Sequence, residues 1–473
     1  MKGRFAITLA LLTLVLSVLA CNLTEPPTPT FIPPPTYTIP PPIEPVTRVP
    51  ELPAETATPA PTEVAAIPAA IAPMYDASIA YHLEQVDNDR LLISVNELVS
   101  FGTRYVNAEP ESTTSGIGGA REWILGRFRA IEEEARTRGV PFVILPHRFV
   151  LEWRGKTTTQ INVVAYLPGV GDRANEVIIV GAHYDSISEV PDISAPGADD
   201  NASGVAVMLE CARVMAQSRH QATVVFVAFS AEDTGRQGSE AFLREVVQVE
   251  GWDVRAMINL DVVGAQTGPD GAVIGDRVRV FSAPPNDSPS RQLARTMHMI
   301  ASSFMPDFWV DMQSTTDRDG RWGDHLTFSN AGYPAVRLTE AAEDPARSNT
   351  TRDTAEWVSA RYMSRVARVV IATLLVLADG PPPPTNLAFK TGNPGGQELT
   401  WAPSPNAAGY IVAVRNADRL TFSRWFQVGA LNVFAWNGES FSGLDALAVA
   451  AIDVNGRQGS FSPEVAVPLP GSP

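Results

Sequence analysis

The chain has 473 residues, 45% of them hydrophobic, and is therefore long enough for two or three domains with a large buried core. Its formal charge of −16 excludes nucleic acid as an expected partner, because a nucleic-acid-binding surface is basic. The two cysteines, Cys21 and Cys211, offer no disulfide if one of them is acylated, and Cys211 is expected to be a buried small hydrophobic residue.

Residues 1–21 have the anatomy of an export signal: a basic start, an apolar middle and a short cleavage region. The last four residues, Val18-Leu19-Ala20-Cys21, resemble a bacterial lipobox. We therefore predict a protein that is exported and anchored to the cell membrane by a lipid on Cys21, facing outside the cytoplasm. An ordinary cleaved signal or a membrane anchor is the alternative.

Residues 22–73 form a Pro- and Thr-rich segment that cannot bury enough apolar surface to fold. We expect a disordered, semi-rigid stalk, with a proline-rich partner ligand as the alternative.

The next part of the chain alternates helical and strand-like patterns, which is typical of an α/β sheet with helices on both faces. Helices are expected at 78–99, 118–135, 202–217, 288–304 and 355–377. Apolar or alternating runs predict strands at 147–153, 160–167, 176–183, 223–229, 256–260 and 334–338.

Polar residues follow three successive apolar strands at the point where each strand ends. His183 and Asp185 end the first, Glu232 and Asp233 follow the second, and Asp261 follows the third. The pair Asp199-Asp200 opens the helix that comes after the first strand. Ligands bind at the carboxyl ends of strands in open α/β sheets, and one imidazole with several carboxylates suits zinc.

After a proline linker at 381–384, residues 385–473 show short alternating runs separated by turn residues, which predicts an antiparallel β-sandwich. The features Trp401-x-Pro, Gly409-Tyr410 and Asp453-Val-Asn-Gly456 resemble a fibronectin type III module. We expect a spacer or a contact with a cell-surface protein or polysaccharide.

Five segments together resemble the family-28 metallopeptidases, in the family's order and over residues 78–378. They are GAHYDS, GADDNASG, FSAEDTGRQGSEAF, INLDVVG and DHLTFSNAGYPA. The family includes co-catalytic zinc aminopeptidases, glutamate carboxypeptidase and the glutaminyl cyclases. The resemblance implies a zinc metallopeptidase domain at 74–380, with a mixed, largely parallel central sheet sandwiched by helices.

The resemblance also implies a role for each motif residue. His183 and Asp261 would hold one zinc, Asp200 would bridge two, and Asp233 would hold the second. Glu232 would be the general base, and Asp185 would orient the imidazole of His183. Asp199, Asp324 and His325 would support the site, with ligation by His325 as a less favoured alternative.

Two residues depart from the family pattern. Asp233 stands where the family usually has Glu, which shortens its reach by about 1.5 Å. Asn349, in Asn349-Thr-Thr-Arg-Asp353-Thr354, stands where the family has its last histidine ligand, and an amide oxygen is a weaker ligand for zinc. Two Zn²⁺ ions are expected, the second of them weak or absent.

The leading hypothesis is an exported, lipid-anchored zinc aminopeptidase that hydrolyses peptide substrates. A single-metal enzyme like the glutaminyl cyclases is a second reading. A non-catalytic binding protein on the same scaffold, as in the transferrin receptor, is a third, against which the presence of Glu232 counts.

Overall fold

The computed structural model describes residues 76–391, 397–430, 433–436 and 444–467. The predicted signal, Cys21 and the predicted stalk lie outside these residues and stay predictions. Among the described helices, none combines the length and the apolar character that crossing a membrane requires.

A nine-stranded sheet forms the centre of the part that precedes residue 380, in the order β1-β3-β5-β4-β6-β9-β7-β8 with β2 paired to β3. The middle strands, β5-β4-β6-β9, are parallel, whereas β3 runs antiparallel to β5 and β7 runs antiparallel to β9. The prediction of a mixed α/β sheet is confirmed, and its parallel pairs are those of this middle together with β7 and β8. The strands are β1 Val143–Ile144, β2 His147–Trp153, β3 Lys156–Leu167, β4 Glu176–His183, β5 Thr223–Phe229, β6 Asp253–Leu260, β7 Arg277–Ser282, β8 Trp309–Met312 and β9 Ala335–Glu340.

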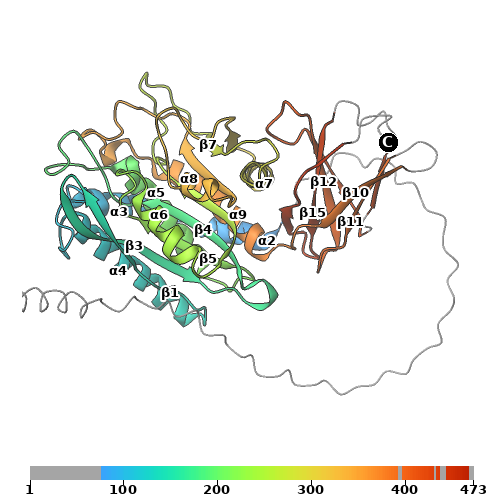
Figure 1. Ribbon diagram of the computed structural model, residues 1–473, viewed down its shortest axis with the longest axis horizontal. Coiled ribbons are helices and arrows are strands. Elements are labelled where there is room, and N and C mark those ends of the chain that lie inside the picture. The colour runs from blue at the N-terminus through green and yellow to red at the C-terminus, as the bar shows by residue number, and fades with distance from the viewer. Residues whose placement is uncertain (1–75, 392–396, 431–432, 437–443, 468–473) are drawn as a thin grey trace, which may run out of the picture. The chain divides into compact units, whose positions relative to one another are not determined.

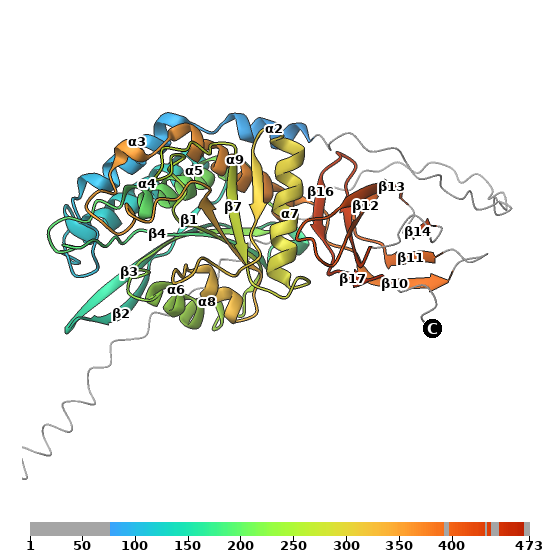
Figure 2. The ribbon, with the colours of Figure 1, turned by 90° about the horizontal axis from the view of Figure 1, so that it is seen from above.

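Helices cover both faces of this sheet (Figure 1). Figure 2 shows α3, α4, α5 and α9 over one face and the short α6 and α8 over the other. Because α5 lies between the sheet and α3 and α9, all but one of its residues are buried. The helices are α2 Ala77–Glu84, α3 Asn88–Ser100, α4 Gly116–Thr137, α5 Gly204–Met215, α6 Gln237–Phe242, α7 Pro289–Phe304, α8 His325–Asn330 and α9 Ala360–Asp379.

The fully apolar strands have the bounds that the sequence predicts. β4 and β5 are buried along almost their whole length, and each fully buried Val, Ile or Phe contributes about 1.5–3 kcal/mol relative to exposure. The single helix predicted at 78–99 is instead α2 and α3. The break comes at Asp87, whose carboxylate accepts hydrogen bonds from the backbone N–H groups of Asp89 and Arg90 and so begins a new helix.

The C-terminal residues form two antiparallel sheets, as the alternating pattern predicts. Apolar side chains of β11, β12 and β15 belong to one buried cluster, so the two sheets share a core. The sandwich and the fibronectin type III likeness stay predictions. The strands are β10 Thr385–Thr391, β11 Gln397–Ala402 and β14 Val433–Trp436 in one sheet, and β12 Gly409–Arg415, β13 Arg424–Val428, β15 Ala446–Ile452, β16 Gln458–Phe461 and β17 Val465–Ala466 in the other.

Candidate metal centre

The predicted site residues follow the carboxyl ends of three neighbouring parallel strands. β4 ends at His183 and pairs in parallel with both β5 and β6. Glu232 comes three residues after β5 ends, and Asp261 directly follows β6. Parallel strands place their carboxyl ends at one edge of the sheet, so residues far apart in the sequence meet there.

One group of ligand atoms forms around Nε2 of His183, and we call His183, Asp200 and Asp261 the Nε2 cluster. The Nε2 atom lies 3.3 Å from Oδ1 of Asp200 and 3.6 Å from Oδ1 of Asp261. The three ligand atoms lie within 4.8 Å of one another, and all three residues are buried. Burial alone would lower the pKa of His183, but the nearby carboxylates raise it well above its usual value.

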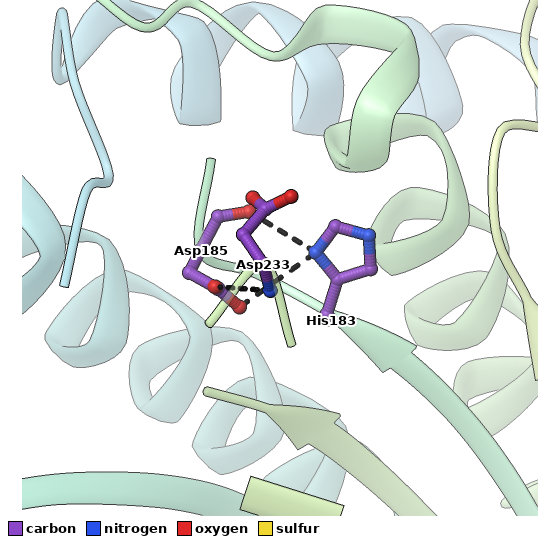
Figure 3. A group of neighbouring side chains, drawn as sticks. All are labelled: His183, Asp185 and Asp233. Atoms are coloured by element: carbon purple, nitrogen blue, oxygen red, sulfur yellow. Dashed lines mark hydrogen bonds and ion pairs between the residues drawn. The ribbon is translucent and has the colours of Figure 1, made fainter. Parts of the chain in front are cut away.

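A second group lies on the other side of the same ring, and we call His183, Asp185 and Asp233 the Nδ1 cluster. Nδ1 of His183 lies 3.2 Å from the backbone oxygen of Asp185, and we assign the ring proton to this nitrogen. Figure 3 shows the other ring nitrogen pointing away from both carboxylates. With Nδ1 protonated, the neutral ring presents the lone pair of Nε2, which is the tautomer that a metal ligand needs.

The carboxylate of Asp185 is already occupied by backbone groups. Its Oδ1 accepts a hydrogen bond from the N–H of Glu232, and its Oδ2 accepts one from the N–H of Asp233, each at 3.1 Å. Asp185 therefore ties the loop after β5 to the end of β4. By contrast, Oδ2 of Asp233 is buried without a hydrogen-bond partner.

Asp200 lies in the segment Ala198–Ser203 before α5, at a kink where Asp200 and Asn201 have non-helical backbone angles, and its peptide bond to Asn201 is cis. The side chain of Asn201 donates to the backbone oxygen of Leu260 and accepts from the N–H of Val262. These two residues flank Asp261, so Asn201 couples the two acidic loops of the Nε2 cluster. Gly204 is required beside it, because a Cβ there would lie 2.4 Å from Oδ1 of Asn201.

Asp199 and Asp353 hold the backbone of the same turn. Oδ1 of Asp199 accepts a hydrogen bond from the backbone N–H of Gly264, and its supporting role stays a prediction. The two oxygens of Asp353 accept from the N–H groups of Asp199 and Asp200, at 2.8 and 2.9 Å. The Asn349–Thr354 segment therefore reaches the Asp200 turn, as the resemblance implies, but makes these contacts through Asp353.

Glu232 follows Ala231, whose φ of 63° turns the chain sharply at the end of β5. The residue is 9% exposed, and none of the hydrogen bonds among the described residues involves its carboxylate. Burial raises the pKa of Glu232 well above its usual value, and the charges of Asp261 and Asp324 act in the same direction. A carboxyl group with a raised pKa beside a candidate metal ligand has the properties of a general base.

The other predicted residues lie outside both clusters. Asn349 is exposed, with a φ of 59°. His325 is fully buried, its Nε2 lies 3.0 Å from the backbone oxygen of Thr316, and burial lowers its pKa to about 4. Burial raises the pKa of Asp324 to about 7.

The donors of the Nε2 cluster fit a zinc ion: one imidazole nitrogen with a free lone pair and two carboxylate oxygens converge from three loops. The donors expected for a second ion do not fit as well, because Asn349 is exposed and Asp233 lies on the Nδ1 side of the ring.

The model of peptidase family M28 matches residues 162–374. A "Probable zinc metalloprotease" of Pyricularia oryzae is 34% identical over 374 residues, covering 71% of this chain and 74% of the relative. The "Probable zinc metalloprotease Lema_P086240" of Leptosphaeria maculans is 31% identical over 393 residues, covering 76% of this chain and 90% of the relative. The chain belongs to peptidase family M28.

Two solved structures share the fold of this chain. LapB from Legionella pneumophila matches with a TM-score of 0.51 at 19% identity, covering 66% of this chain and 78% of that one. LapA from the same organism matches with a TM-score of 0.50, also at 19% identity, over 63% and 75% of the two chains. With relatives named zinc metalloproteases, the M28 chain is a zinc metalloprotease with zinc as its cofactor.

Two arginines near the M28 centre have no role in the sequence-based prediction. Arg337 on β9 places Nη2 2.9 Å from Oδ1 of Asp261 and Nη1 3.0 Å from Oδ2 of Asp317. The positive charge of Arg337 lowers the pKa of Asp261 against the opposing effect of burial. Arg321, in the loop before α8, lies 3.7 Å from Oδ2 of Asp200.

Arg104 is a third arginine that the sequence does not single out. It is fully buried and donates to the backbone oxygens of Tyr184, Leu98, Pro196 and Gly197, at 2.6–3.2 Å. Burial lowers its pKa to about 10. This one side chain joins the loop after β4 to the turn that carries Asp200. Arg104 follows the end of α3 in the sequence, and nothing in the local sequence indicates that its side chain makes these contacts.

Proposed function

We propose that this zinc metalloprotease hydrolyses peptide bonds with zinc held by the Nε2 cluster and with Glu232 as the general base. The observation that carries the proposal is the convergence of Nε2 of His183 with carboxylate oxygens of Asp200 and Asp261 within 4.8 Å. Glu232 is buried, and its backbone N–H donates to Oδ1 of Asp185, two residues after His183.

Zinc bound there would supply a Lewis acid for the scissile carbonyl and would lower the pKa of a bound water. The chain's own residues provide orientation and proton transfer. Asp185 holds Nδ1 of His183 through its backbone oxygen, and it holds the N–H of Glu232 through Oδ1. Glu232 would accept a proton from the attacking water and deliver it to the amine nitrogen of the leaving group.

Removal of N-terminal residues is the activity we propose within this class. The support is the resemblance of the five motifs, in their order, to the family-28 metallopeptidases, which include the zinc aminopeptidases. We also propose that the enzyme is exported and held at the cell membrane by a lipid on Cys21, with the C-terminal sheets available for contact with a cell-surface partner.

The test is Glu232→Gln, which removes the base but keeps the size and the backbone hydrogen bond to Asp185. Zinc content should stay unchanged, and turnover of aminoacyl-anilides should fall at least about a hundredfold. Glu240→Gln, at an exposed position of α6, is the matched control and should stay fully active. Full activity of Glu232→Gln would exclude Glu232 as the base.

A second comparison tests the direction of cleavage. The same peptide is offered with a free and with an acetylated N-terminus. An aminopeptidase should cleave only the free form, whereas equal cleavage of both forms would exclude an aminopeptidase.

A further inference from the structure

The two carboxylate oxygens of Asp200 face different cations. Oδ1 lies 3.3 Å from Nε2 of His183, while Oδ2 lies 3.7 Å from Nη1 of Arg321. In a two-metal centre a bridging carboxylate gives one oxygen to each ion. Here the oxygen that would be left for a second ion faces a guanidinium group.

The guanidinium of Arg321 has few competing partners. Among the described residues, Asp200 is the one carboxylate within 4.0 Å of it, and none of the described hydrogen bonds involves its side-chain nitrogens. The Arg321 side chain is 27% exposed, whereas that of Asp200 is 7% exposed. An arginine stays charged at any pH that a protein tolerates, so this positive charge is permanent.

The other donors of a second site are also unfavourable. Asn349, at the position of the expected histidine, is exposed, and its amide oxygen is neutral. The carboxylate of Asp233 lies with Asp185 on the Nδ1 side of His183 (Figure 3). Charge, donor type and direction therefore all disfavour a second zinc.

We propose that Arg321 takes the electrostatic place of the second cation, so that this chain binds one zinc tightly and neutralises the outer oxygen of Asp200 with a guanidinium. Arg321 is a positioning residue in this arrangement: it fixes Asp200 for the zinc on Nε2 and repels a second ion. The proposal rests on the function proposed above, because it assumes zinc at the Nε2 cluster.

The experiment measures zinc per chain on the full chain, by calorimetric titration of the metal-free protein and by elemental analysis after dialysis at fixed free zinc. The wild type should bind one zinc tightly and a second at least about a hundredfold more weakly. Arg321→Met and Arg321→Gln should tighten the second zinc at least about tenfold. The variant Arg321→Met with Asn349→His should tighten it further, because it restores an imidazole donor.

Arg321→Lys is the matched control, since it keeps a positive charge at the same position, and it should not tighten the second zinc. Retention of the first zinc shows that each variant is folded at the centre. Two equally tight zincs in the wild type, or an unchanged second affinity in both neutral variants, would overturn the role of Arg321 while leaving the peptidase proposal intact. Absence of any zinc from the wild type would overturn both proposals.

Discussion

The two clusters around His183 share one imidazole but differ in what already occupies their carboxylates. In the Nδ1 cluster both oxygens of Asp185 accept backbone N–H groups, so that carboxylate is committed to holding the loop after β5. In the Nε2 cluster Asp200 and Asp261 face the nitrogen that carries the lone pair. The same residue types therefore make a framework on one side of the ring and a candidate zinc site on the other.

Cations also distinguish the clusters. Arg337 pairs with Oδ1 of Asp261, the oxygen that also faces Nε2 of His183, and Arg321 pairs with Oδ2 of Asp200, so each carboxylate of the Nε2 cluster has an arginine partner. Among the described residues, no arginine forms an ion pair with Asp185 or Asp233. Burial and the charge of Asp185 accordingly raise the pKa of Asp233 well above its usual value. Among the described residues, Asp233 therefore lacks the arginine partner that Asp200 and Asp261 each have.

The largest expected effect is the loss of zinc and of turnover when the shared imidazole is removed, compared with removal of a carboxylate from the Nδ1 cluster. His183→Ala should lose zinc and reduce turnover to background, which is more than the 10–100-fold typical of losing a residue outside the ligand set. Asp233→Ala should keep its tight zinc, because Asp233 lies away from Nε2. Elemental analysis and aminoacyl-anilide hydrolysis measure both. If Asp233→Ala lost zinc as completely as His183→Ala, the division into two clusters would be wrong.

Removing zinc with a chelator should produce the next largest effect. An ion that binds only the folded chain, at a free concentration a thousandfold above its Kd, stabilises it by about 4 kcal/mol. Chelation also leaves the charges of Asp200 and Asp261 without their cation. Calorimetry with and without chelator should therefore show a lower Tm for the metal-free wild type. The Tm of His183→Ala should be the same with and without chelator. If the wild-type Tm were also unchanged by the chelator, the Nε2 cluster would not be a zinc site.

The strand ends of the centre could be predicted because they depend on local sequence. The runs at β4 and β5 are apolar enough to be recognised, and parallel pairing then places His183, Glu232 and Asp261 at one edge. The short strands β7 and β8 have no such signal in the sequence. Arg277-Val-Arg-Val does alternate, but its polar positions are arginines beside acidic loop residues, and the run is too short to stand out.

The arginines around the centre could not be predicted, because their partners are set by tertiary contacts. Arg337 faces Asp261 only because β9 pairs with β6, which places Asn259 and Arg337 in register. Arg321 and Asp200 are separated by more than a hundred residues and meet through the loop before α8. The exposure of Asn349 likewise depends on how the loop after β9 folds. Only the identity of the residue, an amide in place of an imidazole, is visible in the sequence.

Asp185→Asn should have an intermediate effect, since it weakens the framework without removing a ligand. One of the two backbone N–H groups, of Glu232 or of Asp233, would lose its acceptor, because an amide has one oxygen. Zinc affinity or turnover should fall roughly 10–100-fold. Asp192→Asn, at an exposed position of the same loop, is the control and should change neither. A loss as complete as that of His183→Ala would make Asp185 a direct ligand.

Asn349→His alone should have the smallest effect. The φ of 59° at this position is one that histidine tolerates better than most residues, so the variant should fold normally. With Arg321 still beside Oδ2 of Asp200, an added imidazole meets only part of the requirement for a second ion. The second zinc should therefore tighten by less than about tenfold, and more when Arg321→Met is combined with it. Zinc titration of the single and double variants shows whether the charge of Arg321 or the donor at position 349 limits binding of the second ion. Two tight zincs in Asn349→His alone would mean that the missing imidazole, and not the guanidinium, keeps the second ion out.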